Sequence, residues 1–451
     1  MKPTLHRQRT TARLATRRGS VLIVVLWIAI GMVGMALYFA DSMRMELRAA
    51  DNRAAGIAAD QAIEGAARYV SYILSNYSTN GVMPGLPTEL CAGVPIGDSR
   101  FWIIGRETNA VPSSVQSDRV TFGLIDEASK FNLNTTSTNL LQWLPNMTMD
   151  LLLAIPDWRS TNSNNGTQLS YPMAQPPYQC KSAPFETVDE LRLVYGSSMD
   201  ILVGEDINRN GILDQNEKDV NGNGQCDPGL LEYLTIYSRE PNFNSDGSMR
   251  TNVNKSVTLR PLLQSVFGSG RASQIMSRLG YSRQVTTLTL PGLLAFYMKS
   301  GMTSIEFAQI YTNVTVSTSA YKQGRVNINS ASLTVLTCLL GGDYGSAQQV
   351  VSYRLNNPGN LNSIAWIVDA LGSSSTALQS LAGGDYITTL SYQCTADIAA
   401  VGPYGRGYRR VKFIFDVSDG APKVLYRQDL THLGWALGED VRRAVLAQNT
   451  P

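Results

Sequence analysis

The side chains with the clearest chemical signal are oxygen donors in the segment 206–217, DINRNGILDQNE. Side-chain oxygens recur at every second position, a glycine permits a sharp turn, and a glutamate closes the segment, which is the spacing of a calcium loop. Ca²⁺ takes about six to eight oxygen ligands, and this loop offers them without nitrogen or sulfur. The predicted ligands are Asp206, Asn208, Asn210, the carbonyl of Ile212, Asp214 and Glu217.

A second oxygen-rich segment follows directly. Side-chain oxygens alternate again, but Leu230 occupies the position where the closing glutamate should be. Glu232 lies two residues further on and could close this loop only if the loop were distorted. We therefore predict a weaker second calcium site, and a loop that is merely polar stays the open alternative. Its ligands would be Asp219, Asn221, Asn223, Gln225, Asp227 and Glu232.

Catalytic residues are hard to assemble from this sequence. It holds two histidines, His6 and His432, and no pattern of nucleophile, base and orienting group. No phosphate-binding or dinucleotide-binding glycine motif occurs either. We therefore do not expect an enzyme. The five cysteines show no CxxC spacing, and Cys91 with Cys180 is a candidate disulfide, although sequence alone does not set connectivity.

The frame that must position these loops begins with an uncharged stretch near the N-terminus. No charged side chain occurs from Gly19 to Ala40, and about 20 helical residues span the roughly 30 Å of a bilayer's hydrocarbon core. Apolar residues, mostly alanine, continue at helical spacing to Ser75 without a proline. We predict one helix over 20–75 that crosses a membrane, with the basic residues 1–19 in the cytoplasm and the rest exported.

The remaining sequence predicts an α+β fold. Aromatic and β-branched residues indicate strands over 100–106 and 119–126, helical patterns dominate to about Leu381, and strands return after Asp385. Strands on both sides of a helical block indicate one antiparallel sheet, packed on the long helix and interrupted by an inserted α-helical domain. The predicted parts are a leader 1–19, the helix 20–75, a head 76–127, the insertion 128–382 with calcium loops 206–232, and the rest of the head 383–451. The later strands are expected at 386–396, 409–417 and 423–428.

The insertion contains a weak internal repeat, with copies at 130–196 and 325–372. Each copy begins with Asn-x-Asn, and helix N-capping is a sufficient reason for Asn134 and Asn329. The copies resemble helix-hairpin-helix (SAM-like) modules, which bind DNA backbones in other proteins. Neither hairpin combines glycine amides with nearby cations, and the chain beyond residue 19 is mildly acidic, so we expect a structural role and no nucleic-acid partner.

The N-terminal tract, Arg17-Arg18-Gly19 followed by the uncharged helix, resembles type IV prepilins and pseudopilins. That resemblance implies cleavage after Gly19 by a prepilin peptidase and a methylated Ser20 as the mature N-terminus. Most members carry glutamate at the fifth mature position, where this chain has Val24. Its absence is characteristic of the K-class minor pseudopilin of type II secretion systems, and LIDEASKFNLNTTS, AIPDWR, FETVDELRLV and GRVNINSASLTVL are similar to phrases of that class.

The resemblance implies a subunit at the tip of the periplasmic pseudopilus that supports protein export across the outer membrane. It also implies a single-pass anchor in the bacterial inner membrane, calcium in the helical domain, and I- and J-class minor pseudopilins as partners. Secreted cargo and the outer-membrane secretin are further candidate partners. Two alternatives stay open: a minor pilin of a type IV pilus, and a membrane-anchored periplasmic DNA receptor built on helix-hairpin-helix modules.

Overall fold

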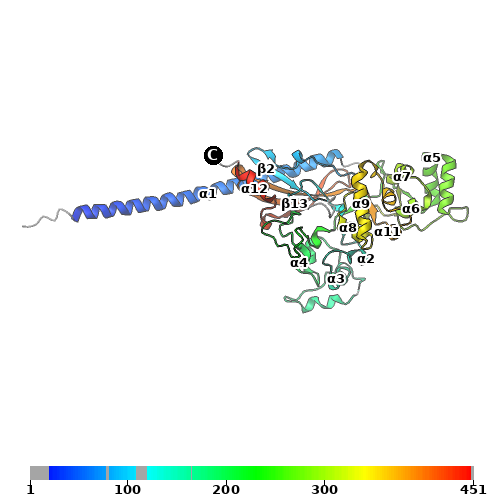
Figure 1. Ribbon diagram of the computed structural model, residues 1–451, viewed down its shortest axis with the longest axis horizontal. Coiled ribbons are helices and arrows are strands. Elements are labelled where there is room, and N and C mark those ends of the chain that lie inside the picture. Colours follow the sequence, from blue (N-terminus) through cyan, green and yellow to red (C-terminus); the bar gives the residue numbers. More distant parts are fainter. Residues whose placement is uncertain (1–19, 78–80, 108–118, 164, 448–451) are drawn as a thin grey trace, which may run out of the picture. The chain divides into compact units, whose positions relative to one another are not determined.

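The computed structural model describes residues 20–77, 81–107, 119–163 and 165–447 (Figure 1). The predicted leader and its cleavage-site residue, Gly19, lie outside these residues. The chain divides into two compact units, Met1–Ala55 and Gly56–Pro451, and each is described by itself.

In the first unit, the described residues form the N-terminal part of one helix, α1 (Ser20–Tyr77). α1 ends two residues beyond Ser75, so the prediction of one long helix is confirmed. Large apolar side chains are exposed from Val21 to Leu47. Among the described residues, α1 is the one helix long and apolar enough to cross a membrane. An exposed apolar surface of this extent calls for lipid or neighbouring helices to cover it.

In the second unit, the C-terminal part of α1 packs on a sheet. Gly56 allows a close approach, because a Cβ there would lie 2.7 Å from the Arg409 guanidinium. Asp60 and Glu64 form ion pairs with Arg409 and Arg427 of the sheet, each at 3.4 Å. Small and apolar residues recur three or four positions apart and are buried along one helix face. They are Ala59, Ala62, Ile63, Ala66 and Val70.

The sheet is antiparallel and has the order β1-β2-β12-β13-β14, with β3 paired to β12 as well. Its strands come from both ends of the second unit, which confirms the α+β class and the interrupted sheet. The predicted strand 119–126 forms a strand only at its end, as β3. The predicted strand 386–396 is wrong, because it is divided between β11 (Ile387–Thr388) and β12. The strands are β1 (Val94–Ile96), β2 (Ser99–Ile104), β3 (Ile125–Asp126), β12 (Gln393–Val401), β13 (Arg409–Asp416) and β14 (Lys423–Asp429).

Both faces of the central strand β12 are covered, and every residue in it is buried. Ile398 and Ala400 face the main core that includes α1, whereas Ala399 and Val401 face a smaller apolar cluster. That smaller cluster includes Leu437, which precedes helix α12 (Gly438–Ala447), and Ile212 of the first predicted calcium loop. The loop therefore packs on the sheet face that α1 leaves open.

The segment between β3 and β12 is not purely helical, as had been expected. It contains four two-stranded sheets as well as helices. Its helices are α2 (Thr138–Leu141), α3 (Met149–Arg159), α4 (Met199–Val203), α5 (Ser256–Leu279), α6 (Leu293–Ser300), α7 (Ser304–Ile310), α8 (Leu333–Leu339), α9 (Tyr344–Asn356), α10 (Trp366–Leu371) and α11 (Thr376–Leu381). The antiparallel pair is β6 (Arg239–Pro241) with β9 (Tyr321–Gln323).

The other three pairs are parallel and reveal three repeats instead of the two that were predicted. They are β4 (Phe131–Asn132) with β5 (Leu234–Thr235), β7 (Thr251–Asn252) with β8 (Val314–Thr315), and β10 (Val326–Asn327) with β11 (Ile387–Thr388). In each pair, an asparagine that opens an Asn-x-Asn motif lies opposite a threonine that ends the closing strand. We call the segments 131–235, 251–315 and 326–388 the first, middle and last repeats.

The second asparagine of each motif clamps a distant loop and does not cap a helix, so the capping interpretation is wrong. Asn134 accepts from the Phe185 amide at 2.8 Å and donates to the Phe185 carbonyl at 3.0 Å. Asn254 makes the same pair of bonds with Leu290, at 2.8 and 3.1 Å. Asn329 donates to the Leu361 carbonyl at 3.0 Å. Ser137 and Ser332 occupy the N-cap positions of the first helices in the first and last repeats.

Candidate metal centre and its charged support

The first predicted loop is closed by its own side chains. The Asp206 carboxylate accepts from the amides of Asn210 (2.8 Å) and Gly211 (2.9 Å), and Gly211 has the positive φ of 85° that this turn requires. Glu217 accepts from the amides of Asn208 (3.1 Å) and Asp214 (3.0 Å). The structure thus brings the first and last predicted ligands onto one loop core.

The donor set fits calcium on one further observation. Asn208 Oδ1 is buried and has no hydrogen-bond partner, while Nδ2 of the same side chain donates to Asp214 (2.6 Å) and to the Trp435 carbonyl (3.2 Å). Burial, and then nearby carboxylates, raise the pKa of Asp206 and of Glu217. A bound cation would satisfy that oxygen and favour both ionised carboxylates. The described residues contain no group of three or more His, Cys, Asp or Glu side chains set for a metal ion, so a calcium site here would depend on asparagine and carbonyl oxygens as well.

The second loop repeats this arrangement at the surface. Asp219 accepts from the amides of Gly222 (2.6 Å) and Gly224 (2.7 Å). Its asparagines, Asn221 and Asn223, both donate to Asp227, at 2.5 and 3.0 Å. In the first loop, the two asparagines donate to Asp214 in the same way. The Gln225 amide donates to Asn223 Oδ1 at 2.7 Å, as the Ile212 amide does to Asn210 Oδ1.

The acid that supports the second loop is one that the sequence analysis missed. Glu232, the predicted closing ligand, pairs with Arg106 at 2.9 Å. Glu205 is buried and accepts from the amides of Val220 (2.6 Å) and Asp227 (3.1 Å). Glu217 binds two amides of the first loop in a comparable pattern. The twelve-residue spacing gives no signal for Glu205, because it precedes both loops in the chain.

The two loops together form one excursion from the first repeat. Gly204 pairs with Pro228 in an isolated antiparallel bridge, and the Glu205 amide donates to the Asp227 carbonyl at 3.0 Å. The chain therefore leaves the repeat and returns to it at the same place. The excursion 205–227 also reaches the sheet, through Ile212 and through the arginines described next.

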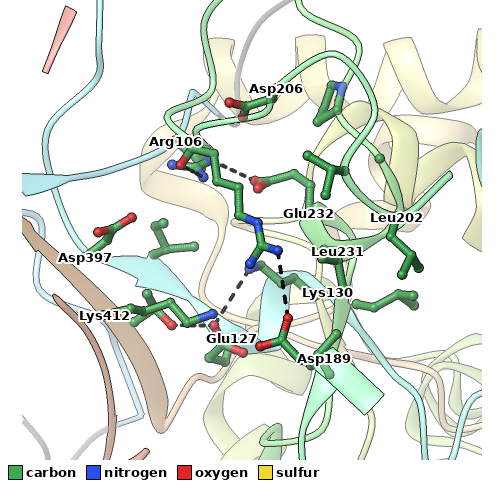
Figure 2. Close-up of a pocket in the computed structure, with 18 of the residues that line it drawn as sticks. Arg106, Glu127, Lys130, Asp189, Leu202, Asp206, Leu231, Glu232, Asp397 and Lys412 are labelled. Carbon is green, nitrogen blue, oxygen red and sulfur yellow. Dashed lines mark hydrogen bonds and ion pairs between the residues drawn. The ribbon is translucent and has the colours of Figure 1, made fainter. Parts of the chain in front are cut away.

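Two arginines attach the first loop to the sheet. Arg410 of β13 is fully buried, donates to Asp397 of β12 at 2.8 and 2.6 Å, and donates to the carbonyls of Asn208 (2.5 Å) and Arg209 (2.7 Å). Arg106 donates to the same Arg209 carbonyl at 2.9 Å. Figure 2 shows the Arg106–Glu232 pair beside Asp206.

A cavity of about 70 Å³ lies beside Arg106 and is lined by apolar side chains together with charged side chains of both signs (Figure 2). Lys130 lies 3.8 Å from Glu127, and Arg209 lies 3.8 Å from Asp189. Burial lowers the pKa of Lys412, which lies on the same wall. Burial alone would raise the pKa of Glu127, but Lys130, Lys412 and two hydroxyl hydrogen bonds together lower it. Such paired charges support the loop and the sheet.

The hairpins of the first and last repeats pack against each other. A Cβ at Gly342 would lie 2.6 Å from the Trp143 ring, and Gly342 has a φ of 90°. Asp343 caps α9, since it accepts from the Ser346 amide at 3.0 Å. Packing and capping therefore account for the last hairpin's glycine and acid.

Other predicted sites have mixed outcomes. Ser20 begins α1, and Val24 is exposed on it. The candidate disulfide is wrong, because Cys91 and Cys180 are both free thiols. The Cys91 thiol donates to the Pro87 carbonyl, and the Cys180 thiol to the Asp157 carbonyl, both at 3.3 Å.

Comparison with known proteins gives a distant likeness to solved structures. No family description matches the sequence, and no curated protein is similar to it. Among solved structures, the GspK-GspI-GspJ complex of the enterotoxigenic Escherichia coli Type 2 Secretion System contains a similar chain. That chain is 10% identical with a TM-score of 0.38, over 82% of this chain and 96% of the other.

Proposed function

We propose that this chain is a K-class minor pseudopilin that ends the pseudopilus of a type II secretion system and supports protein export across the outer membrane. The observation that carries the proposal is α1. One continuous helix begins at Ser20, directly after the Arg17-Arg18-Gly19 tract, and its exposed apolar surface passes into a buried alanine stripe on an antiparallel sheet.

The tip position rests on the fifth mature residue. In this class of filament, the resemblance implies that a glutamate at that position pairs with the N-terminal amine of a neighbouring subunit. A carboxylate in the membrane costs free energy unless it is paired. A subunit with no neighbour above it has no amine to pair with a glutamate, so the uncharged Val24 is the more stable choice at this position. The long insertion between β3 and β12 suits a terminal subunit, since it would crowd the interior of a filament.

Membrane and partners follow from the same proposal. The uncharged stretch anchors the chain in the inner membrane, and the second unit lies in the periplasm. I- and J-class minor pseudopilins would contact α1 and the sheet, and the prepilin peptidase would act at Gly19. The role is structural, and no catalytic activity is assigned to the chain.

Calcium is the proposed ligand of the excursion 205–227. Asp206, Asn208 and Glu217 would hold the ion in the first loop, together with the other predicted oxygens. In the second loop, Glu205 takes the supporting place that Glu232 had been expected to fill. The ion would supply folding energy for the excursion and no chemical step.

N-terminal sequencing of the protein from cells with and without the prepilin peptidase tests the family. We expect a methylated Ser20 at the N-terminus with the peptidase, and an uncleaved chain without it. A mature protein that still begins before Gly19 would overturn the proposal.

The tip position has its own test. The wild-type chain should co-purify with I- and J-class subunits and label only filament ends, whereas Val24→Glu should allow it along the filament. Val25→Glu is the matched control, because it places the same charge one residue away from the pairing position. Wild-type protein distributed along the filament would refute the tip assignment.

A further inference from the structure

The middle repeat has an unusual charge. The segment 247–320 contains one acidic residue, Glu306, where the average of 36 acids in 451 residues would place about six. By contrast, the first repeat with its loops, 128–238, has 13 acids and 6 cations. Helices α5, α6 and α7 of the middle repeat lie together at one end of the second unit (Figure 1). One end of this unit therefore carries an excess of positive charge.

The exposed cations of this repeat are not neutralised within it. Among the described residues, five exposed cations have no ion-pair partner: Lys255, Arg260, Arg278, Arg283 and Lys299. The one acid is already bound, because Arg271 donates to both oxygens of Glu306 at 2.8 Å and to the Gly301 carbonyl at 2.8 Å. An added acidic group would therefore meet cations that are free to pair with it.

One of these cations reaches the end of α6, and a second belongs to the last turn of that helix. The Arg278 guanidinium lies over Gly301, where a Cβ would come within 2.1 Å of Nη1, and Lys299 lies two residues before Gly301. Ile305, next to the acid that Arg271 binds, is 74% exposed. Cations at helix ends are expected from the helix dipole, which explains where Arg278 and Lys299 stand. The dipole does not explain the lack of acids around them.

We propose that Arg278, Lys299 and Ile305 form a docking surface for a protein partner that presents carboxylates around an apolar side chain. Arginine is enriched at protein interfaces, and cations without an ion-pair partner call for acidic groups on the partner's surface. This inference goes beyond the proposed function and does not depend on it.

Nucleic acid and membrane fit this surface less well. The exposed large apolar residues described in 247–320 are Met249, Val257, Val266, Val285 and Ile305, and none of them is aromatic. Single strands and bilayer interfaces are usually met by aromatic side chains. The repeat does have a glycine hairpin, at Gly268, but Arg271, the cation that follows it, is committed to Glu306.

The test uses the full chain in detergent and poly-L-glutamate as the carboxylate probe, with binding followed by fluorescence anisotropy at low and physiological salt. Arg278→Glu with Lys299→Glu should weaken binding about tenfold or more at low salt. Arg68→Glu with Arg100→Glu, which makes the same charge change at exposed positions elsewhere, should weaken it less than about twofold. Arg278→Gln with Lys299→Gln repeats the test if the charge reversal impairs folding, which a melting curve reports.

Every other outcome overturns the proposal. Equal losses in the test and control variants would reduce the effect to net charge. Tighter binding of a short DNA duplex, or of phosphatidylglycerol vesicles, that the same variant abolishes would assign the surface to nucleic acid or to membrane. Self-association that the variant abolishes, measured by sedimentation without a probe, would assign it to the acidic first repeat of a second copy.

Discussion

Arg410→Met tests the attachment of the first calcium loop to the sheet. The substitution keeps a long apolar side chain in the same space but removes every hydrogen bond of the guanidinium. Asp397 then keeps a buried carboxylate without its cation, and the carbonyls of Asn208 and Arg209 each lose a donor. The first loop therefore loses its hydrogen bonds to the sheet at Asn208, the residue whose side-chain Oδ1 is buried without a hydrogen-bond partner.

The expected cost is large because both members of the pair are buried. Breaking a buried ion pair by removing one partner costs about 3–5 kcal/mol of unfolding free energy. Burial alone would raise the pKa of Asp397, and the Arg410 guanidinium holds it below its usual range. In the variant the pKa of Asp397 should rise, because burial is then opposed only by the more distant cations Arg106 and Lys412. The penalty should therefore be complete at neutral pH and should shrink as the pH falls and the carboxyl protonates.

Urea unfolding followed by tryptophan fluorescence measures this cost, and one of the six tryptophans, Trp435, lies at the loop, since its carbonyl accepts from Asn208. Arg409→Met is the matched control: it is the neighbouring arginine, partly exposed, and its 3.4 Å pair with Asp60 should be worth less than about 1 kcal/mol. Adding Asp397→Asn to Arg410→Met should restore about half of the loss, because no unpaired charge is left buried. Equal costs for the two arginines, or no recovery in the double variant, would refute the reasoning.

Three further predictions follow from single contacts. In the presence of calcium, Glu217→Gln should lower the melting temperature of the protein as much as a chelator lowers that of the wild type. Adding a chelator to the variant should then lower its melting temperature little further. A wild-type melting curve unchanged by chelation would exclude a structural metal. Asn254→Ala removes both bonds to Leu290 and should cost about 1–3 kcal/mol in urea unfolding, and a cost below about 0.5 kcal/mol would show that the clamp is dispensable. Hydrogen bonds from Arg271, followed by the Thr303 amide, lower the pKa of Glu306 from 4.5 to about 2. That contribution to stability is complete above about pH 4.5 and is lost as the pH falls through about 2, so Glu306→Gln should be less stable than the wild type by up to about 1 kcal/mol at neutral pH and equal to it near pH 2. A difference that persists at pH 2 in matched thermal melts would contradict this assignment.

Local sequence patterns were enough to predict the long helix and most of the sheet. The α1 prediction succeeded because a run without proline and with alanine at helical spacing admits few other structures. β13 and β14 were found from their aromatic and β-branched residues, within one residue of their ends. Both kinds of signal lie within the element that they predict.

The middle repeat was missed for a physical reason. Its two hairpin helices are merged into α5 across Gly268, whose φ of 77° is the one sign of the break. The motif at Asn252 and Asn254 continues with lysine, where the other two copies continue with threonine or serine. What the three repeats share is the clamp from the second asparagine to a distant loop, and that contact is invisible without the fold.

The residues that support the calcium loops could not be predicted from the sequence either. The predicted ligands follow from spacing, since they are neighbours in the chain. Arg410 donates to the carbonyl of Asn208, which lies 202 residues away in the chain. Glu205 accepts from the Val220 amide of the second loop, although Glu205 precedes that loop in the sequence. Only tertiary structure brings such partners together.

The bridge between Gly204 and Pro228 bears on how rigid the second unit can be. The insertion enters and leaves the sheet through adjacent strands, β3 and β12, so the two ends of the insertion lie close together. The excursion 205–227 adds a further connection to the sheet, far along the chain from β3. The Gly204–Pro228 bridge joins its base to the first repeat, and Arg410 of the sheet donates to the Asn208 carbonyl in its first loop. Arg239 of β6 also pairs with Asp416 of β13 at 2.6 Å, so the insertion is held on the sheet at several separate places and the contact with Arg410 is one of them.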